Sequence, residues 1–101
     1  MPFNLDQVPI RNSPDKNRFE APLNGAVAIA EYMDRGKMIV FTHTEVPEGY
    51  EGKGIGGKLV KFALDYAREH EKQVMPLCPY VAAYLKRHPE YQDLVLPGYR
   101  Y

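Results

Sequence analysis

A run of glycines and lysines lies in the middle of the chain, at Gly52-Lys53-Gly54-Ile55-Gly56-Gly57-Lys58. Glycine has no Cβ and adopts positive φ freely, so successive backbone N–H groups in such a run can converge on an anion. An apolar stripe at helical spacing follows, and the first turn of a helix presents unpaired N–H groups to the same anion. The run predicts a phosphate-binding loop, and a tight turn that allows close helix packing is the alternative.

Two common phosphate-binding motifs fit this run incompletely. The P-loop spacing Gly52-x-x-x-x-Gly57-Lys58 is present, but Leu59 follows where a Ser or Thr must bind Mg²⁺. The dinucleotide fingerprint Gly52-x-Gly54-x-x-Gly57 requires a strand that leads straight into its first glycine. An irregular segment intervenes in this chain, so neither motif explains the run.

The elements predicted around the run are strands and two helices. Period-2 alternation with turn signals predicts strands, and apolar residues at helical spacing predict helices. In chain order the elements are a short strand over residues 17–21, a strand over 26–32, a hairpin turn at 34–37, a strand over 38–46, a helix over 55–71, a strand over 73–78, a helix over 80–88 and a short turn at 89–94. Both alternating rows of 26–32 begin apolar, so this strand is predicted to be covered on both faces.

Length and composition predict one soluble domain. The 101 residues carry 13 basic and 13 acidic side chains, so the formal net charge is zero and nothing favours DNA, RNA or an anionic membrane as a partner. The chain shows neither a signal peptide nor a membrane-spanning apolar run, and its one cysteine fits a reducing compartment, so we expect a cytoplasmic protein without a metal site. Three prolines in residues 1–16 predict a flexible arm before a domain over 17–96, with a tail at 97–101.

Four blocks of sequence resemble one family. They are His43-Thr44-Glu45-Val46-Pro47, the glycine run, Met75–Val81 and Arg87–Tyr91. Gly54 and Gly56 also fit the motif [Gln/Arg]-x-x-Gly-x-[Gly/Ala], although Glu51 stands at the Gln or Arg position. Over residues 18–95 the chain thus resembles the small single-domain GNAT-like acyltransferases. The resemblance implies a minimal GNAT fold of the α+β class, an α/β three-layer arrangement in which a mixed, mostly antiparallel sheet is flanked by two helices.

The resemblance also implies a bound cofactor. In that family the glycine loop binds the pyrophosphate of acetyl-CoA, and pantetheine lies between two splayed strands, here 38–46 and 73–78. Pro76 removes one ladder N–H at the place where such a splay is expected. Lys53 and Lys58 could pair with phosphates or be solvated surface lysines. The residues expected to contact acetyl-CoA or coenzyme A are Val46, Gly52, Lys53, Gly54, Ile55, Gly56, Gly57, Lys58, Cys78 and Tyr80.

Four side chains near the strand ends could assist acetyl transfer. Cys78 could take the acetyl group as a nucleophile, or it could be a buried apolar residue. His43 and Glu45 share one strand face, and either could deprotonate an amine, while a buried and hydrogen-bonded His43 is the alternative. Tyr84 is placed like the tyrosine with which many GNAT enzymes protonate the departing CoA thiolate, or it is a core aromatic residue.

Three functions remain open on these grounds. The first is an N-acetyltransferase whose acceptor is a small amine or a protein lysine side chain. The second is a CoA or acyl-CoA binding module without turnover, because small members of the family lack the segments that form the acceptor pocket in longer ones. The third is a small interaction domain with a glycine turn. The resemblance and the charge balance together predict a monomer or a weak homodimer that binds neither nucleic acid nor membrane.

Overall fold

A five-stranded sheet forms the centre of the computed structural model, which describes residues 3–101. The strands lie side by side in chain order and are β1 (Arg11–Ser13), β2 (Arg18–Leu23), β3 (Ala26–Asp34), β4 (Met38–Glu45) and β5 (Gln73–Pro76). The first four strands are antiparallel neighbours, and β4 pairs parallel to β5. Three short 3-10 turns complete the chain, namely η1 (Leu5–Gln7), η2 (Pro14–Lys16) and η3 (Pro89–Leu94).

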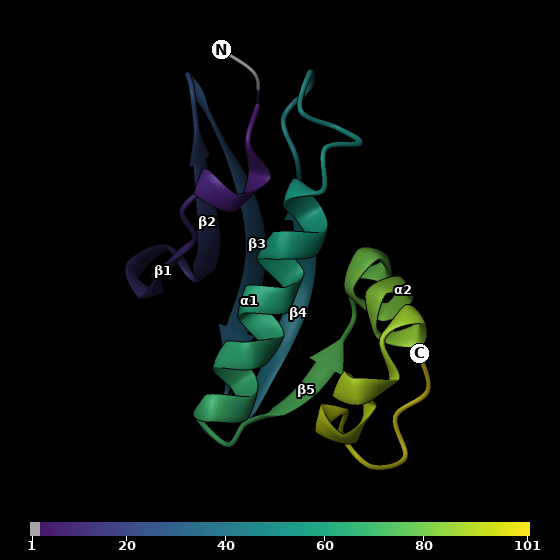
Figure 1. Ribbon diagram of the computed structural model, residues 1–101. Coiled ribbons are helices and arrows are strands. Elements are labelled where there is room, and N and C mark those ends of the chain that lie inside the picture. Colours follow the sequence, from purple (N-terminus) through teal and green to yellow (C-terminus); the bar gives the residue numbers. More distant parts are fainter. Residues whose placement is uncertain (1–2) are drawn as a thin grey trace.

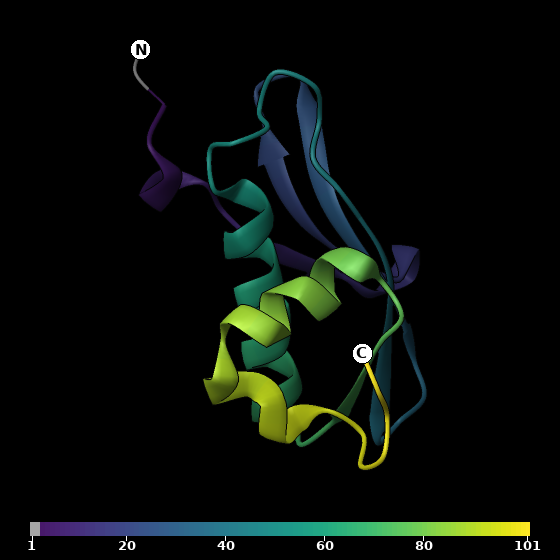
Figure 2. The ribbon, with the colours of Figure 1, turned by 90° about the vertical axis from the view of Figure 1, so that its right-hand side faces the viewer.

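Two α-helices pack against this sheet. The helix α1 (Ile55–Glu69) connects β4 to β5 and lies along one face, and α2 (Pro79–Arg87) lies beside it past the end of β5 (Figures 1 and 2). This mixed, mostly antiparallel sheet with two main helices confirms the predicted fold class. The helix α1 ends two residues before the predicted residue 71, because Glu71 adopts a positive φ of 54° and the N–H of Lys72 donates to the carbonyl of Ala67 at 2.8 Å.

The hydrophobic core lies between the sheet and α1. The helix is amphipathic, and its buried residues are Ile55, Gly56, Leu59, Val60, Ala63, Leu64 and Ala67. Across from them the sheet contributes Phe19, Phe41 and Val74, which are each buried to 1% exposure or less. Removal of this apolar surface from water is what holds α1, and with it the glycine loop, in a fixed place on the sheet.

The strand β3 is buried on one face only. Its residues Ala28, Ala30 and Tyr32 are buried, whereas Val27 and Ile29 are half-buried. The prediction that both faces are covered is wrong, because α1 lies on the face of Ala28 and Ala30 and the opposite face remains accessible (Figure 2). We call this opposite face the outer face of the sheet; by strand register it carries Arg18, Glu20, Val27, Ile29, Glu31, His43 and Glu45, and of these side chains only Glu20 is buried.

The strands β4 and β5 diverge toward the glycine loop. Their parallel pairing ends at Phe41 with Pro76, and the N–H of Cys78 then donates to the carbonyl of Phe41 at 2.9 Å. β5 ends two residues before the predicted residue 78, because Pro76 has no N–H and the chain turns into α2. Among residues 3–101, no strand pairs with Thr42–Glu45 on the edge of β4 that faces β5 (Figure 1). Peptide groups on such an edge can bind an extended ligand.

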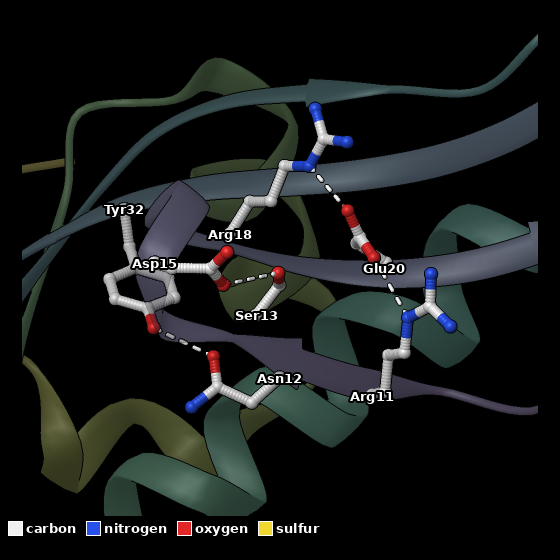
Figure 3. A network of polar contacts seen from close by, with 7 residues as sticks. All are labelled: Arg11, Asn12, Ser13, Asp15, Arg18, Glu20 and Tyr32. Carbon is white, nitrogen blue, oxygen red and sulfur yellow. Dashed lines mark hydrogen bonds and ion pairs between the residues drawn. The ribbon is translucent and has the colours of Figure 1, made fainter.

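The N-terminal residues join the sheet from Arg11 onward, which differs from the arm predicted over residues 1–16. The strand β1 pairs antiparallel with β2, and the hydroxyl of Tyr32 in β3 donates to Oδ1 of Asn12 at 2.7 Å (Figure 3). A strand of three residues is too short to produce a period-2 pattern, and tertiary contacts place it. The domain boundary predicted at residue 17 therefore falls between two paired strands.

Glu20 is buried at the junction of β1 and β2 and bonds two arginines. Arg11 and Arg18 each donate from Nε to its carboxylate, at 2.8 and 2.7 Å, and the carboxylate is 2% exposed (Figure 3). The hydrogen bond from Arg11, and then that from Arg18, hold the pKa of the Glu20 carboxyl below its ordinary value of 4.5. The charged carboxylate is therefore the form that stabilises the fold.

We expect Glu20→Gln to lower the free energy of unfolding at neutral pH by about 1–2 kcal/mol, since charged hydrogen bonds are lost and one partner is solvent-exposed. Because folding lowers the pKa of Glu20, its contribution is present above pH 4.5 and disappears as the pH falls through the folded-state pKa. Urea unfolding at several pH values should show that the free energy of unfolding falls less steeply with decreasing pH in the variant than in the wild type. Glu69→Gln, on the exposed end of α1, is the control. If the free energy of unfolding of Glu20→Gln depends on pH as that of the wild type does, the charged Glu20 carboxylate does not stabilise the fold.

Candidate functional site

A cavity of about 340 Å³ lies where the end of β4, the glycine loop and the start of α2 meet. Its lining residues are Thr44, Val46, Tyr50, Glu51, Gly52, Gly54, Ile55, Gly56 and Tyr80. Six of the ten predicted cofactor contacts are among them, namely Val46, Gly52, Gly54, Ile55, Gly56 and Tyr80. The unpaired edge of β4 leads directly into this cavity, because Thr44 belongs to both.

The glycine run provides the N-cap and the first turn of α1. Gly54 is the N-cap residue with φ of 84°, and its carbonyl accepts the N–H of Lys58 at 3.0 Å. Within residues 3–101, no side chain caps this end of the helix. The first-turn N–H groups of α1 therefore have no internal acceptor there, and the positive end of the helix dipole adds to their attraction for an anion.

Gly56 allows α2 to approach α1 closely. A Cβ built on Gly56 would lie 2.8 Å from Cζ of Tyr80, whereas a Cβ on Gly57 would have only Tyr84 in ordinary contact, at 3.9 Å. The side chain of Tyr80 is 41% exposed and closes one side of the cavity. Gly56 thus lines the cavity beside Tyr80, whereas Gly57 does not line it.

Cys78 lies behind the cavity wall. It is buried at 3% exposure as the N-cap residue of α2, and its Sγ is 3.4 Å from Oγ1 of Thr44. Thr44 lines the cavity and Cys78 does not. The thiol therefore packs behind the threonine, which fits the interpretation of Cys78 as a small buried residue.

His43 and Glu45 lie together, but on the outer face. Nε2 of His43 is 3.3 Å from Oε2 of Glu45, and their side chains are 54% and 65% exposed. In register with β3, His43 pairs with Glu31, whereas Thr44 pairs with the buried Ala30. The structure thus does not bring His43 and Glu45 to the side of the sheet that holds Cys78 and the cavity. A buried His43, the alternative considered above, is wrong.

Tyr84 is part of the core between α2 and η3. It is 6% exposed, and its ring stacks on that of His88 at a centroid distance of 3.9 Å. Burial raises the pKa of its phenol above the ordinary value. Tyr80, one turn earlier, lines the cavity, and Tyr84 does not.

The two lysines of the glycine run contact the N-terminal segment. Nζ of Lys58 donates to the carbonyls of Leu5 and Val8, and Nζ of Lys53 lies 5.6 Å from the ring centroid of Phe3. Neither lysine lines the cavity. These contacts give no support to the prediction that Lys53 and Lys58 bind phosphate: the Lys58 ammonium bonds two carbonyls, and Lys53 is exposed beside the ring of Phe3.

Three lining residues are not among the predicted cofactor contacts, namely Thr44, Tyr50 and Glu51, and of these only Glu51 was considered, as the residue at the Gln or Arg position of the motif. Thr44 alternates with His43 and Glu45, so period-2 alternation could have placed it on the opposite face. Tyr50 follows Pro47-Glu48-Gly49 in an irregular loop, and its hydroxyl donates to the carbonyl of Asn24 at 3.3 Å. This contact spans 26 residues of the sequence, and no local pattern could have predicted it.

The described residues offer neither a metal site nor a membrane span. In the chain from residue 3 on, no group of three or more His, Cys, Asp and Glu side chains could hold a metal ion. No helix in that part is long and apolar enough to cross a bilayer. The cavity beside the glycine run, larger than the cavities of about 270 and 190 Å³ elsewhere, is therefore the candidate site.

The family model of GCN5-related N-acetyltransferases matches residues 18–94. This chain belongs to the GCN5-related N-acetyltransferase family. The match begins with β2 and ends with η3, so it includes the glycine loop, the two diverging strands and both helices. The GNAT resemblance inferred from four sequence blocks is confirmed.

Relatives of this GNAT domain occur in vertebrates. The proteins named NATD1 of Mus musculus and Homo sapiens are each 42% identical over 88 residues, which covers 80% of this chain and 78% and 76% of those proteins. NATD1 of Danio rerio is 36% identical over 95 residues, with 86% of each chain covered. A GCN5-like protein of Staphylococcus aureus, whose solution structure was determined by NMR, aligns with a TM-score of 0.70 at 27% identity and 88% coverage of both chains. The fold therefore extends across distant members of the GNAT family.

Proposed function

We propose that this protein binds acetyl-CoA and transfers its acetyl group to an amine acceptor. The observation that supports the proposal is the continuity between the unpaired edge of β4 and the cavity at the first turn of α1. One side of this path offers backbone groups to an extended chain, and its end offers N–H groups to an anion. Acetyl-CoA combines these chemistries, since a chain with two amides joins a thioester to a pyrophosphate.

The residues at the site fit such a ligand. In this proposal the N–H groups of Ile55 and Gly56 hold the pyrophosphate, because both residues line the cavity and the helix begins there without a side-chain cap. The edge of Thr42–Glu45 is placed to pair with the amides of pantetheine, as a further strand would. Bound acetyl-CoA would supply an activated thioester at the cavity. Zero net charge of the chain is compatible with this assignment, since backbone groups supply the attraction.

In the proposed reaction the amine reaches the thioester from the outer face, past the unpaired edge of β4, so the groups that move protons come from the two sides of the sheet. His43 and Glu45 are exposed on the outer face, where an amine can approach. In this proposal the imidazole of His43 accepts a proton from the amine, and Glu45, 3.3 Å away, stabilises the resulting cation. On the cavity side, we assign to the phenol of Tyr80, which lines the cavity, the return of a proton to the leaving thiolate. Cys78 supports Thr44 by packing in this assignment.

A binding module without turnover is the second candidate. One observation favours it, namely the accessible outer face, on which Val27 and Ile29 are half-buried. An acceptor pocket needs walls that exclude water and orient the amine. The two candidates share the CoA site and differ only in whether an acceptor is held next to it.

The test is calorimetric titration with acetyl-CoA together with intact-protein mass after incubation. We expect saturable binding and no thiol-dependent gain of an acetyl group, because Cys78 is 3% exposed. Cys78→Ala should bind acetyl-CoA within about twofold of the wild type, since it changes only a side chain behind the lining. A gain of one acetyl group that disappears in Cys78→Ala would instead make Cys78 a nucleophile. Absence of binding would overturn the CoA proposal and leave the interaction domain.

An acceptor screen then separates the enzyme from the binding module. With acetyl-CoA bound, release of free CoA thiol in the presence of small amines and of lysine-containing peptides indicates turnover. His43→Ala should lower the rate of any such turnover by about a hundredfold without changing affinity for acetyl-CoA, which is typical for loss of a general base. Binding without turnover for every acceptor class favours the module.

A further inference from the structure

The N-terminal segment of the described chain packs beside the glycine loop and the first turn of α1. Leu5 lies against Gly54, such that a Cβ built on Gly54 would be 2.9 Å from Cδ2 of Leu5. The ring of Phe3 meets that of Tyr50 edge to face at a centroid distance of 6.2 Å. Figures 1 and 2 show the 3-10 turn η1 beside the first turn of α1. We call residues 3–10 the N-terminal strap.

Lys58 ties the strap to α1. Its ammonium donates to the carbonyl of Leu5 at 2.8 Å and also to the carbonyl of Val8, and both bonds are partly buried. Val8 is itself buried at 9% exposure and belongs to the core cluster. Hydrogen bonds from a charged donor are stronger than neutral ones, so a single side chain holds the strap at two points about one helical turn from the N-cap of α1.

Tyr50 connects the strap to the cofactor cavity. Its side chain lines the candidate site on one side and a second cavity of about 270 Å³ on the other, where Phe3, Val8 and Leu23 are among the neighbouring lining residues. A change in the position of the strap therefore reaches the candidate site through Tyr50 as well as through Gly54.

The glycine loop needs such support. Gly49, Gly52 and Gly54 all adopt positive φ, and glycine loses more conformational freedom on ordering than any other residue. A loop that is ordered before the ligand arrives does not have to be ordered during binding, which increases affinity.

We propose that Leu5 and Lys58 are positioning residues, and that the N-terminal strap holds the glycine loop and the first turn of α1 in the conformation that binds the CoA pyrophosphate. The effect on affinity rests on the proposed function, whereas the effect on loop order does not. Lys58 acts through the strap and does not contact the ligand.

The test uses Leu5→Ala, Lys58→Met and the double variant, with Lys61→Met as the control. Lys61 lies one turn further along α1, and its ammonium bonds Asp65 and not the strap. Two quantities are measured, hydrogen exchange in the free protein and the calorimetric Kd for coenzyme A. Exchange is followed at the two hydrogen-bonded amides that bracket the glycine loop, those of residues 50 and 58, which donate to the carbonyls of Pro47 and Gly54 at 3.1 and 3.0 Å. Amides of β3 report exchange through global unfolding, so local opening of the loop is separated from loss of the fold.

In each single variant the loop amides should exchange about tenfold faster than in the wild type. The Kd for coenzyme A should rise about tenfold, as expected for loss of one anchoring contact. The double variant should lose little more than either single one, because both residues act through the same segment. Lys61→Met should stay within about twofold of the wild type on both measures.

Two results would overturn the proposal. Weaker binding in Lys58→Met alone, with loop exchange unchanged in both single variants, would make Lys58 a direct phosphate ligand. Unchanged loop exchange together with unchanged affinity would leave the strap without a role in the site. If the wild type binds no coenzyme A, the proposed function fails, and loop exchange alone decides whether the strap orders the loop.

Discussion

Gly56→Val is expected to weaken the binding of coenzyme A by about a hundredfold, which corresponds to about 2.7 kcal/mol. The reason is steric. A Cβ on Gly56 already conflicts with the ring of Tyr80, and two further methyl groups would extend into the cavity that Gly56 lines. The Tyr80 ring can turn away because it is 41% exposed, so the fold should survive while the site is filled.

Gly57→Val is the matched control for this prediction. It makes the same chemical change in the same helical turn, and a Cβ there meets only the Tyr84 ring at 3.9 Å. Both substitutions change helix propensity equally, so a difference between them reports the cavity and not the helix. Calorimetric titration with coenzyme A measures both, and circular dichroism checks that α1 remains. Equal affinity of the two variants would contradict the placement of the phosphate site beside Gly56.

Phe19→Ala is expected to lower the free energy of unfolding by about 3–5 kcal/mol. Phe19 is completely buried in β2, and its ring contacts those of Tyr32, Phe62 and Tyr66 at centroid distances of 5.0 to 5.8 Å. Truncation leaves a cavity that these rings cannot fill, because they belong to three different positions on β3 and α1. A domain of this size has a total stability of about 5–15 kcal/mol, so the variant should be near the limit of folding.

Phe62→Ala serves as the control, since it removes the same side chain from the same cluster at a site that is 39% exposed. Its expected cost is about 1 kcal/mol, the size of one aromatic contact. Urea unfolding followed by fluorescence of the 8 tyrosines gives both values. A loss below about 1.5 kcal/mol in Phe19→Ala would show that the cluster can collapse around the missing ring.

Most of the fold could be predicted from local patterns. The strands β3 and β4 and the helix α1 have long, regular periodicity, and their predicted starts at residues 26, 38 and 55 agree with the structure. The elements that sequence reasoning missed or misplaced are short or irregular. The strand β1 has three residues, and the end of β5 depends on where Pro76 stops its pairing with β4.

The candidate site was predictable where the chemistry is carried by the backbone. Gly54 and Gly56 line the cavity because positive φ and close approach of another chain segment require glycine, and this requirement is visible in the residue type. Side-chain roles were less predictable. His43, Cys78 and Tyr84 are close to the strand ends in sequence, but their surroundings differ. His43 is exposed beside Glu45, Cys78 is buried beside Thr44, and Tyr84 stacks on His88 in the core.

The sequence alone was enough to predict the family, the order of the main strands and helices, and the location of the glycine loop that lines the cavity, since these depend on local periodicity and on glycine. Only the tertiary structure decided which side of the sheet each polar residue faces. A bulge between Glu31 and Tyr32 shifts the register of β3 on β4, and α1 covers a single face, so His43 and Glu45 lie outside while Thr44 lies at the cavity. Tertiary structure likewise assigned Lys58 to the strap, because the carbonyls it bonds are 50 and 53 residues away in sequence.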